Sequence, residues 1–343
     1  MTRNKACWAS MTVLLIVTLV LAGCTPEPTP APEPTKAAPV EKTVRELQNG
    51  KPFRYITNGL EHPVIRTMIQ GFLDACEKYD ADCEVMGAGG FEDSDYIRLV
   101  ETAIAQGASG AVISTYGPFR PAEQQGIDQG IPMVGFHTPM KEGEMPGLLA
   151  WVATDVEQYG KDAAKAMADK LQCNGPIAIT QNTFNDVENV AASSFTEEMQ
   201  RLCPGVAVYP PELEGGDQSA AIAKAGAILT AHPDLAGAFG TTGGSPTTWG
   251  KALEQAGRKP GDVIVIGMDY TRPNLDLVKA GWVYALVGQP IYEETYRAVE
   301  LLIDHLRGLP VEFNNVYPSP IITADDLDKY YIYADKVDAA MEK

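Results

Sequence analysis

Residues 263–269 read VIVIGMD, a run of apolar residues and one glycine that ends in a carboxylic acid. An uninterrupted apolar run of this length is typical of a strand that is covered on both of its faces. Similar runs recur from residue 53 onwards, and each is separated from the next by a segment whose apolar residues have helical spacing. This alternation indicates an α/β protein built on parallel sheets with helices on both faces.

The alternation runs through two tandem series that share no detectable sequence repeat. In the first series we expect strands at residues 53–57, 83–86, 110–115, 131–136 and 148–154. In the second series we expect strands at residues 176–180, 206–209, 235–239, 263–268 and 283–287, with helices between them and over residues 291–307. Roughly 300 residues take part, which is more than one hydrophobic core usually serves, so we expect two doubly wound units.

Polar residues follow nearly every predicted strand. In open parallel sheets, ligands bind beyond the carboxyl ends of the strands. Each of these residues alone could be a helix cap or a turn residue. Their coincidence at one edge of both sheets favours a binding site, and we expect its members to be Asn58, His62, Ser114, Thr115, Tyr116, His137, Thr138, Gln181, Asn182, Asn185, Thr241, Thr242, Asp269 and Gln289.

The N-terminus carries export signals. Basic residues precede an apolar run over residues 11–22, which is shorter than the roughly 20 residues that a transmembrane helix needs. Residues 1–23 are therefore predicted to be a signal peptide. The box Leu21-Ala22-Gly23-Cys24 resembles that of bacterial lipoproteins, which implies lipidation of Cys24; an ordinary signal peptide with a chance cysteine is the alternative. Residues 24–50 are predicted to be a proline-rich linker that works as a semi-rigid spacer.

Composition excludes several partners. The formal net charge is −18, and no long basic run occurs. A strongly acidic chain repels nucleic acid and anionic lipid. We therefore expect no nucleic-acid partner, and contact with a membrane only through the lipid anchor.

Four cysteines remain beyond the signal peptide and Cys24. An even number in an exported chain suggests disulfides, and four cysteines allow three pairings. Cys76 and Cys83 close a short loop, and Cys173 and Cys203 follow two predicted helices that flank one strand, so the pairs 76–83 and 173–203 are favoured. Buried free thiols are the alternative.

No motif indicates an enzyme. The chain lacks GxSxG, HExxH and GxGxxG, and residues 243–252, GGSPTTWGKA, lack the spacing of a phosphate-binding loop. There is no CxxC and there are only four histidines, so a zinc site is not expected. We expect a binding protein without catalytic residues, cofactor or metal.

Several motifs, in their order and spacing, resemble type I periplasmic sugar-binding proteins, such as the ribose- and galactose-binding proteins of ABC importers. The motifs are IPMVGFHT at 131–138, WVATD at 151–155, AHPDLAGAFG at 231–240, VIVIGMD at 263–269 and YALVGQP at 284–290. The resemblance covers about residues 53–331.

This resemblance implies two lobes that are joined by a hinge of three crossing strands and that close on one sugar. The first lobe would comprise residues 51–152 and 290–318, and the second residues 153–289 and 319–343. By position, the resemblance assigns ligand contacts to Asn58, His62, Ser114, His137, Thr138, Asn185, Asn189, Thr242, Asp269 and Gln289. Tyr116, which follows a strand directly, is the expected stacking aromatic, whereas Phe136 and Trp151 are expected in the core.

The expected cargo is a neutral sugar or sugar-like polyol. The arginines by which related proteins grip sugar hydroxyls are replaced by neutral residues, so nothing would balance a buried anion. The resemblance also implies an extracytoplasmic, lipid-anchored monomer that delivers the sugar to an ABC transporter permease. A ligand sensor for a membrane receptor and a binder of a nucleoside or furanosyl signal are the alternatives.

Overall fold

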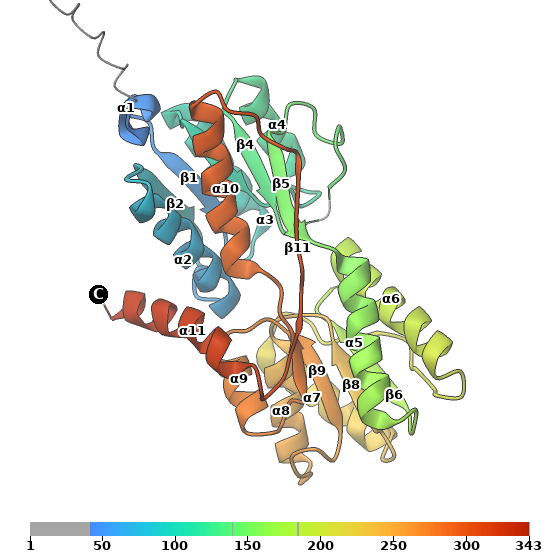
Figure 1. Cartoon of the computed structure of the whole chain (residues 1–343). Coiled ribbons are helices and arrows are strands. Elements are labelled where there is room, and N and C mark those ends of the chain that lie inside the picture. The colour runs from blue at the N-terminus through green and yellow to red at the C-terminus, as the bar shows by residue number, and fades with distance from the viewer. Residues whose placement is uncertain (1–41, 139, 184, 343) are drawn as a thin grey trace, which may run out of the picture. The chain divides into compact units, whose positions relative to one another are not determined.

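A computed structural model describes residues 42–138, 140–183 and 185–342. The predicted signal peptide, Cys24 and most of the predicted linker lie outside the described residues. Two six-stranded sheets form the framework, and each is covered by helices on both faces (Figure 1).

The first sheet is entirely parallel and has the strand order β11-β5-β4-β3-β1-β2. Its inner strand β1, which lies next to the edge strand β2, is buried at every position, as the sequence pattern predicts. The strands are β1 (Phe53–Thr57), β2 (Cys83–Gly87), β3 (Gly110–Ile113), β4 (Met133–Phe136), β5 (Ala150–Thr154) and β11 (Asn314–Tyr317).

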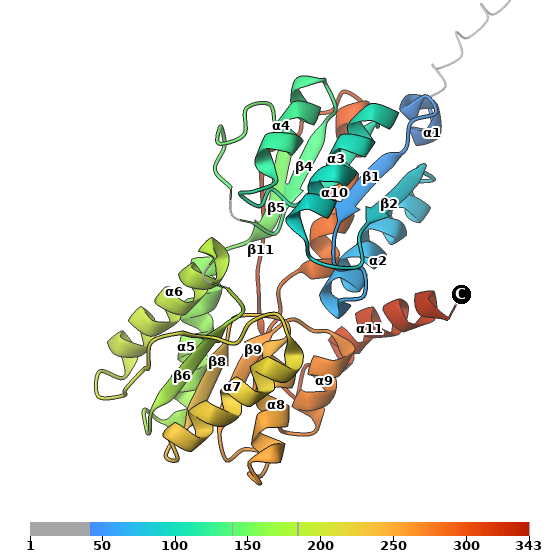
Figure 2. The same ribbon diagram turned by 180° about the vertical axis from the view of Figure 1, so that it is seen from behind.

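Two pairs of helices cover the first sheet. One face carries α2 (Pro63–Lys78) and α10 (Ile291–Leu306), and the other carries α3 (Asp93–Gln106) and α4 (Arg120–Asp128) (Figures 1 and 2). Aromatic rings fix the contact between sheet and helix: the ring centroid of Tyr55 lies 5.6 Å from that of Phe72 and 5.5 Å from that of Phe136. Phe136 is therefore a core residue, as expected.

The second sheet has the order β12-β10-β9-β8-β6-β7, and only β12 is antiparallel to its neighbour. The strand expected at residues 206–209 is displaced: Val208 forms a single bridge to Ile177, and regular pairing begins only at Glu212. Pro210 and Pro211 have no N–H to donate, so the segment cannot form one continuous ladder. The strands are β6 (Ile177–Gln181), β7 (Glu212–Leu213), β8 (Gly237–Gly240), β9 (Ile264–Met268), β10 (Ala285–Val287) and β12 (Ile321–Ile322).

Five helices pack on the second sheet. Asp155, Asn185 and Asp217 cap three of them, because each side chain accepts a hydrogen bond from the main-chain N–H three residues further on. One face carries α5 (Val156–Leu171) and α6 (Asp186–Leu202), and the other carries α7 (Gln218–Ala231), α8 (Ser245–Gln255) and α9 (Arg272–Lys279) (Figure 2).

The chain passes between the two sheets three times: from β5 to α5, from β10 to α10 and from β11 to β12. Two of these passages are joined by a buried hydrogen bond of 2.5 Å between the hydroxyls of Thr154 and Ser319. The architecture confirms the predicted fold class, two doubly wound parallel-sheet units connected by three segments.

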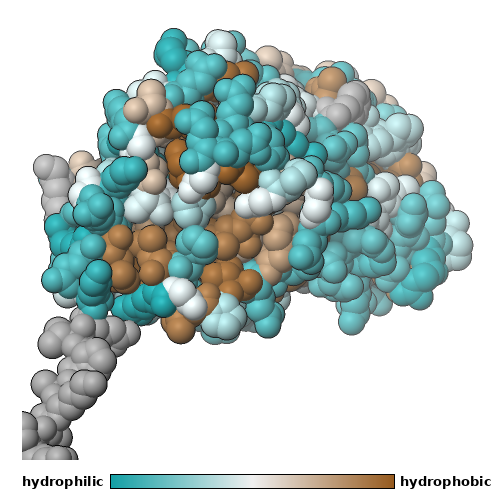
Figure 3. All heavy atoms as spheres, turned by 90° about the horizontal axis from the view of Figure 1, so that it is seen from above, coloured by the Kyte–Doolittle hydropathy of each residue, from teal (hydrophilic) through white to brown (hydrophobic). Residues whose placement is uncertain are grey.

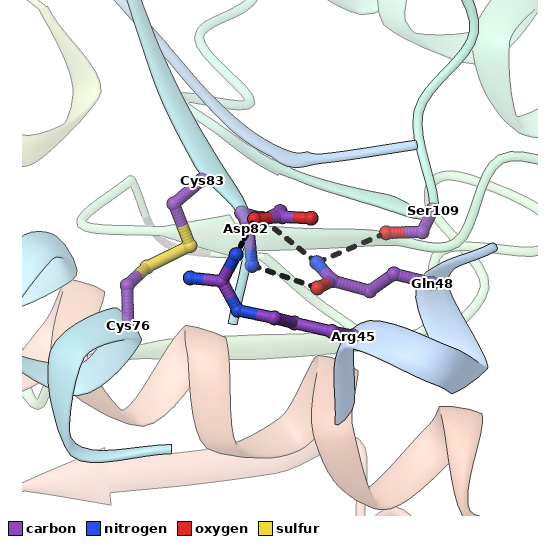
Figure 4. Close-up of a disulfide and its surroundings, with 6 residues drawn as sticks. All are labelled: Arg45, Gln48, Cys76, Asp82, Cys83 and Ser109. Atoms are coloured by element: carbon purple, nitrogen blue, oxygen red, sulfur yellow. Dashed lines mark hydrogen bonds and ion pairs between the residues drawn. A yellow bond between two sulfur atoms is a disulfide. The ribbon is translucent and has the colours of Figure 1, made fainter. Parts of the chain in front are cut away.

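A short helix begins within the segment that was expected to be linker. Helix α1 (Val44–Gln48) has a capping box formed by Thr43 and Glu46, and Val44 is 3% exposed. Arg45 pairs with Asp82, and Gln48 hydrogen-bonds to the main chain of Asp82 and to Ser109 (Figure 4). The predicted boundary at residue 50 is thus too late, because residues 43–48 pack on the first sheet's unit.

The last helix contacts helices of both units. Helix α11 (Leu327–Met341) packs on α2 and on α9. Lys336 hydrogen-bonds to Asp74 on α2 at 2.5 Å, and Arg272 on α9 pairs with Asp335 and Asp338. Residues 319–343, which were expected with the second lobe alone, are therefore also attached to the first.

Two disulfides brace the units. Cys76 is joined to Cys83 and Cys173 to Cys203, the two pairs that the sequence favours. The first connects the end of α2 to the start of β2 (Figure 4), and the second connects the segments that follow α5 and α6.

The surface seen from above Figure 1 is mainly hydrophilic, with hydrophobic residues gathered in patches between the hydrophilic ones (Figure 3). Apolar atoms supply more than half of an ordinary water-facing surface, so scattered patches need no special explanation. No helix within the described ranges has the length and apolarity that crossing a bilayer requires.

Removal of the Cys173–Cys203 disulfide should destabilise the protein more than removal of Cys76–Cys83. The cysteines are separated by 30 residues in the first case and by 7 in the second, and loop-closure entropy corresponds to about 3.7 and about 2.5 kcal/mol, respectively. Thermal unfolding of the two double-serine variants checks the order. If the two variants lose equal stability, or if the Cys76–Cys83 variant loses more, loop-closure entropy does not determine the contribution of these disulfides.

Candidate functional site

Three residues at strand ends have left-handed backbones. Thr115 follows β3 with φ 57°, His137 follows β4 with φ 66°, and Asp269 follows β9 with φ 67°. The other non-glycine residues of this conformation in the described ranges lie at or just after helix ends; they are Asn49, Asp80, Gln172 and Cys173. Backbone strain away from helix ends concentrates at functional sites, so these three strand ends mark the candidate site.

Asp269 is a buried carboxylate, and one of its oxygens has no hydrogen-bond partner in the described part of the chain. It is 3% exposed, and its Oδ1 meets no donor among the described residues. Its loop is held instead by Asn274, whose side-chain amide donates to the carbonyls of Asp269, Met268 and Gly243. Burial raises the pKa of Asp269 to about 7.

His137 and Glu294 form the charged contact nearest to Asp269. His137 Nδ1 lies 3.1 Å from Glu294 Oε2. Burial lowers the pKa of His137, but the charges of Glu294 and Asp269 outweigh it and raise the pKa overall. Burial raises the pKa of Glu294, although His137 opposes the rise. Glu294 Oε1 is also buried without a partner.

This cluster joins the two units. His137 belongs to the first sheet's unit and Asp269 to the second, and each changes the pKa of the other through its charge. A methyl group at Gly243 would lie 2.5 Å from Asp269 Oδ2 and 2.8 Å from Val64 Cγ2 of helix α2, so the units approach closely here and only glycine fits. Gln289, 5% exposed, lies on the passage from β10 to α10.

The predicted asparagines of the second unit differ in whether their side-chain atoms already have hydrogen-bond partners. Asn185 caps α6, and both polar atoms of its side chain bond to Glu188, at 2.9 and 2.7 Å. Asn189 Oδ1 accepts from Gln181 at 3.2 Å. Asn182 Oδ1, by contrast, is buried and has no partner among the residues that the structure describes. Asn182 is therefore better placed than Asn185 to meet a ligand.

Two further buried carboxylates, Glu188 and Glu214, hold the loops at this edge of the second sheet, and neither was predicted from the sequence. Glu188 accepts from the hydroxyl of Thr241 at 3.0 Å and from the main-chain N–H of Asn182 at 2.6 Å. Glu214 accepts from the hydroxyl of Ser245 at 2.7 Å. Burial raises the pKa of both, that of Glu214 to about 6.

The remaining predicted residues of the second unit have structural partners. The hydroxyl of Thr242 accepts from the main-chain N–H of Gly244 at 3.0 Å. Trp249 is fully buried, and its indole donates to Thr180 at 3.0 Å. Trp249 is thus a core residue.

In the first unit a buried network holds the loop after β3. The main-chain N–H of Ser114 donates to the hydroxyl of Tyr96, and this hydroxyl donates to Glu123 at 2.8 Å. Thr115 also donates to Glu123 through its N–H. The loop presents Tyr116, which is 39% exposed.

The loops after β4 and β1 complete the edge. The indole of Trp151 donates to the carbonyl of Thr138 at 2.6 Å, which fixes that loop. His62 precedes the first residue of α2, and burial lowers its pKa. Within the described ranges, no hydrogen bond joins Asn58, His62, Ser114, Tyr116 or Thr138 to the cluster of Asp269, His137 and Glu294.

The site is poor in cations. Among the described residues, no Lys or Arg forms an ion pair with Asp269, Glu294, Glu188 or Glu214. The described part of the chain also contains no group of three or more His, Cys, Asp or Glu residues that could hold a metal ion. The arrangement can therefore accept hydrogen bonds from a ligand.

Known proteins share this sequence pattern and fold. The xylose/arabinose-binding protein XylF of Sulfolobus acidocaldarius is 21% identical over 265 residues, which are 69% of this chain and 62% of that protein's length. A sugar-binding protein of a sugar ABC transporter from Bacillus halodurans superposes with a TM-score of 0.73 at 23% identity, over 82% of this chain and all of that one. A structure of the XylFII–LytSN complex gives 0.71 at 20% identity, over 80% and 99%.

The sequence profile of the periplasmic binding protein domain matches residues 53–310, which include both sheets' central strands and every loop of the candidate site from His62 to Gln289. This is a family of extracytoplasmic solute-binding proteins and not of enzymes. The chain belongs to the periplasmic binding protein domain family.

Proposed function

We propose that this protein captures a neutral sugar or sugar-like polyol between its two lobes. The observation that carries the proposal is Asp269, a buried carboxylate on a strained strand end that has no partner of its own. Buried polar groups are nearly always hydrogen-bonded, so an orphaned one points to a missing donor. Sugar hydroxyls are such donors, and one carboxylate can accept two of them. The names of XylF and of the Bacillus halodurans protein agree with this choice.

The proposed ligand contacts are shared between both lobes. Asp269 accepts hydroxyls, Asn182 Oδ1 and Gln289 offer further polar atoms, and the rings of His62 and of the partly exposed Tyr116 supply flat faces. Because the ligand touches both lobes, it binds the closed arrangement better than an open one and so favours closure. The proposed contacts remain Asn58, His62, Ser114, Tyr116, His137, Thr138, Asn182, Asn185, Asn189, Thr242, Asp269 and Gln289.

Delivery and location form the next part of the proposal. We infer that Cys24 carries the lipid anchor outside the cytoplasm and that the loaded monomer docks on an ABC transporter permease. A sensor subunit is the second candidate, because a protein of this fold occurs in the XylFII–LytSN complex. Pull-down from solubilised membranes with and without ligand distinguishes the two by the identity of the captured partner.

Asp269→Ala should remove ligand binding and leave the fold intact. Truncating one partner of a buried charged hydrogen bond costs about 2 kcal/mol or more, which is roughly a 30-fold loss of affinity. The melting temperature of the ligand-free variant should equal or exceed that of the wild type, because a costly buried carboxylate is gone. Calorimetric titration and thermal unfolding measure the two effects. If the variant binds the ligand as tightly as the wild type does, Asp269 is not a ligand contact.

Affinity should rise with pH up to about 7 and then level off. The pKa of Asp269 in the ligand-free protein is about 7, whereas its ordinary value is 3.8, and hydroxyl donors prefer the ionised carboxylate. Below pH 7 the affinity should therefore gain at most about tenfold per pH unit. As the pH rises from about 4 to 7, the ligand-free protein should become less stable. In this range the folded protein still holds a proton on Asp269 that the unfolded chain has released. Titrations at several pH values test this, and Asp269→Asn should flatten the profile.

Gln289→Ala should weaken both contact and closure, because Gln289 is buried on one of the three passages between the sheets. Small-angle scattering with and without ligand should show a smaller compaction than in the wild type. Gln255→Ala, at an exposed position near the end of α8, is the matched control. Unchanged affinity and compaction in Gln289→Ala would exclude this role.

A further inference from the structure

The cluster around Asp269 contains more hydrogen-bond acceptors than donors. Among the described residues in or beside this cluster, four buried acceptor atoms have no partner: Asp269 Oδ1, Glu294 Oε1, Asn182 Oδ1 and Asn274 Oδ1, the last on the side chain that donates to the carbonyl of Asp269. Leaving such atoms unsatisfied is costly, so a bound ligand has to bring donors.

Tyr159 is a buried phenol that is influenced by Asp269 and Glu294 and by a third carboxylate, Glu188. It lies in the first turns of α5, is 1% exposed, and its hydroxyl also has no partner. Burial raises its pKa most, and the charges of Asp269, Glu188 and Glu294 raise it further. One phenol therefore feels three carboxylates that come from the end of β9, from α6 and from α10.

The carboxylates that act on Tyr159 are not matched by an equal number of cationic groups. His137 is the only cationic group that acts on Asp269 and Glu294 in the described part of the chain. Glu188 is satisfied by Asn182, Asn185 and Thr241, which are neutral. Like charges in a buried site repel one another, and a neutral ligand leaves that repulsion in place. An anionic ligand would increase it.

We propose that the cargo carries a protonated amine, as in an amino sugar or an aminopolyol, and that its ammonium group lies against Asp269 and Glu294. The inference rests on the proposed function for the site and for the polyol part of the cargo, and it departs from it in charge, because a protonated amine replaces one hydroxyl of the neutral sugar. An ammonium has three donors, no acceptor and a positive charge, whereas a hydroxyl adds an acceptor for each donor. It therefore corrects both the donor deficit and the charge imbalance, and the remaining hydroxyls meet the neutral Asn and Gln side chains.

The test compares matched ligands that differ in one group. The full-length mature protein is titrated at pH 7.5 with glucose and glucosamine, galactose and galactosamine, mannose and mannosamine, and sorbitol and glucamine. The N-acetyl forms of the three amino sugars keep the nitrogen and remove the charge. We expect at least one amine to bind tenfold or more tightly than both its hydroxyl and its N-acetyl counterpart.

Two isosteric variants locate the preference. Asp269→Asn and Glu294→Gln should each reduce the ratio between the amine and its hydroxyl counterpart by tenfold or more, because each removes a charge and keeps the side chain's size. Asp328→Asn removes the same charge at an exposed position on α11 and should leave the ratio unchanged. If neither variant folds, the ratio between the affinities for the amine and for its hydroxyl counterpart is compared in the wild type at 0.05 and 0.5 M salt. Salt screens a buried ion pair much less than it screens exposed charges, so the tighter binding of the amine should persist at the higher concentration.

The outcomes separate this inference from the proposed function. Neutral sugars that bind as tightly as their amines overturn the inference and leave the proposed function standing. Binding by no member of the panel counts against both. An amine preference that survives in both isosteric variants places the ammonium elsewhere and overturns the assignment to Asp269 and Glu294.

Discussion

Parallel strands bring all their last residues to the same edge of a sheet, and most of the candidate site follows from this constraint. In both sheets the loops that leave this edge carry the polar side chains, while inner strands such as β1, β6 and β9 are almost wholly buried. The three passages of the chain bring the two edges together, so that His137 from one sheet and Asp269 from the other lie within reach of each other's charge. Each side chain would be an ordinary loop residue in a different topology.

The strand ends were predictable because apolar runs stop abruptly. Asp269 after VIVIGM and His137 after VGF stand out in the sequence, and the structure finds both at strained strand ends. The buried glutamates were not predictable in this way. Glu188 and Glu294 lie in the first turns of helices, where an acid is ordinarily explained by the helix dipole, and only tertiary contacts show that they are buried.

Other differences have local causes. The strand expected at 206–209 moved because two prolines interrupt its ladder. Helix α1 is too short to be recognised by periodicity, although its capping box, Thr43 and Glu46, is visible in the sequence. Asn185 shows the reverse case: an asparagine expected to meet ligand has both side-chain atoms engaged as a helix cap. Sequence position alone cannot separate these roles, because capping and ligand binding use the same side chain at the same strand exit.

The disulfides occupy the opposite edges. Cys76–Cys83 lies where β2 begins, and Cys173–Cys203 lies beyond the carboxyl ends of α5 and α6, so both are remote from the strand ends that carry His137 and Asp269. Each cross-link also stays within one unit. An oxidising environment therefore cross-links each half within itself, and neither disulfide ties one half to the other.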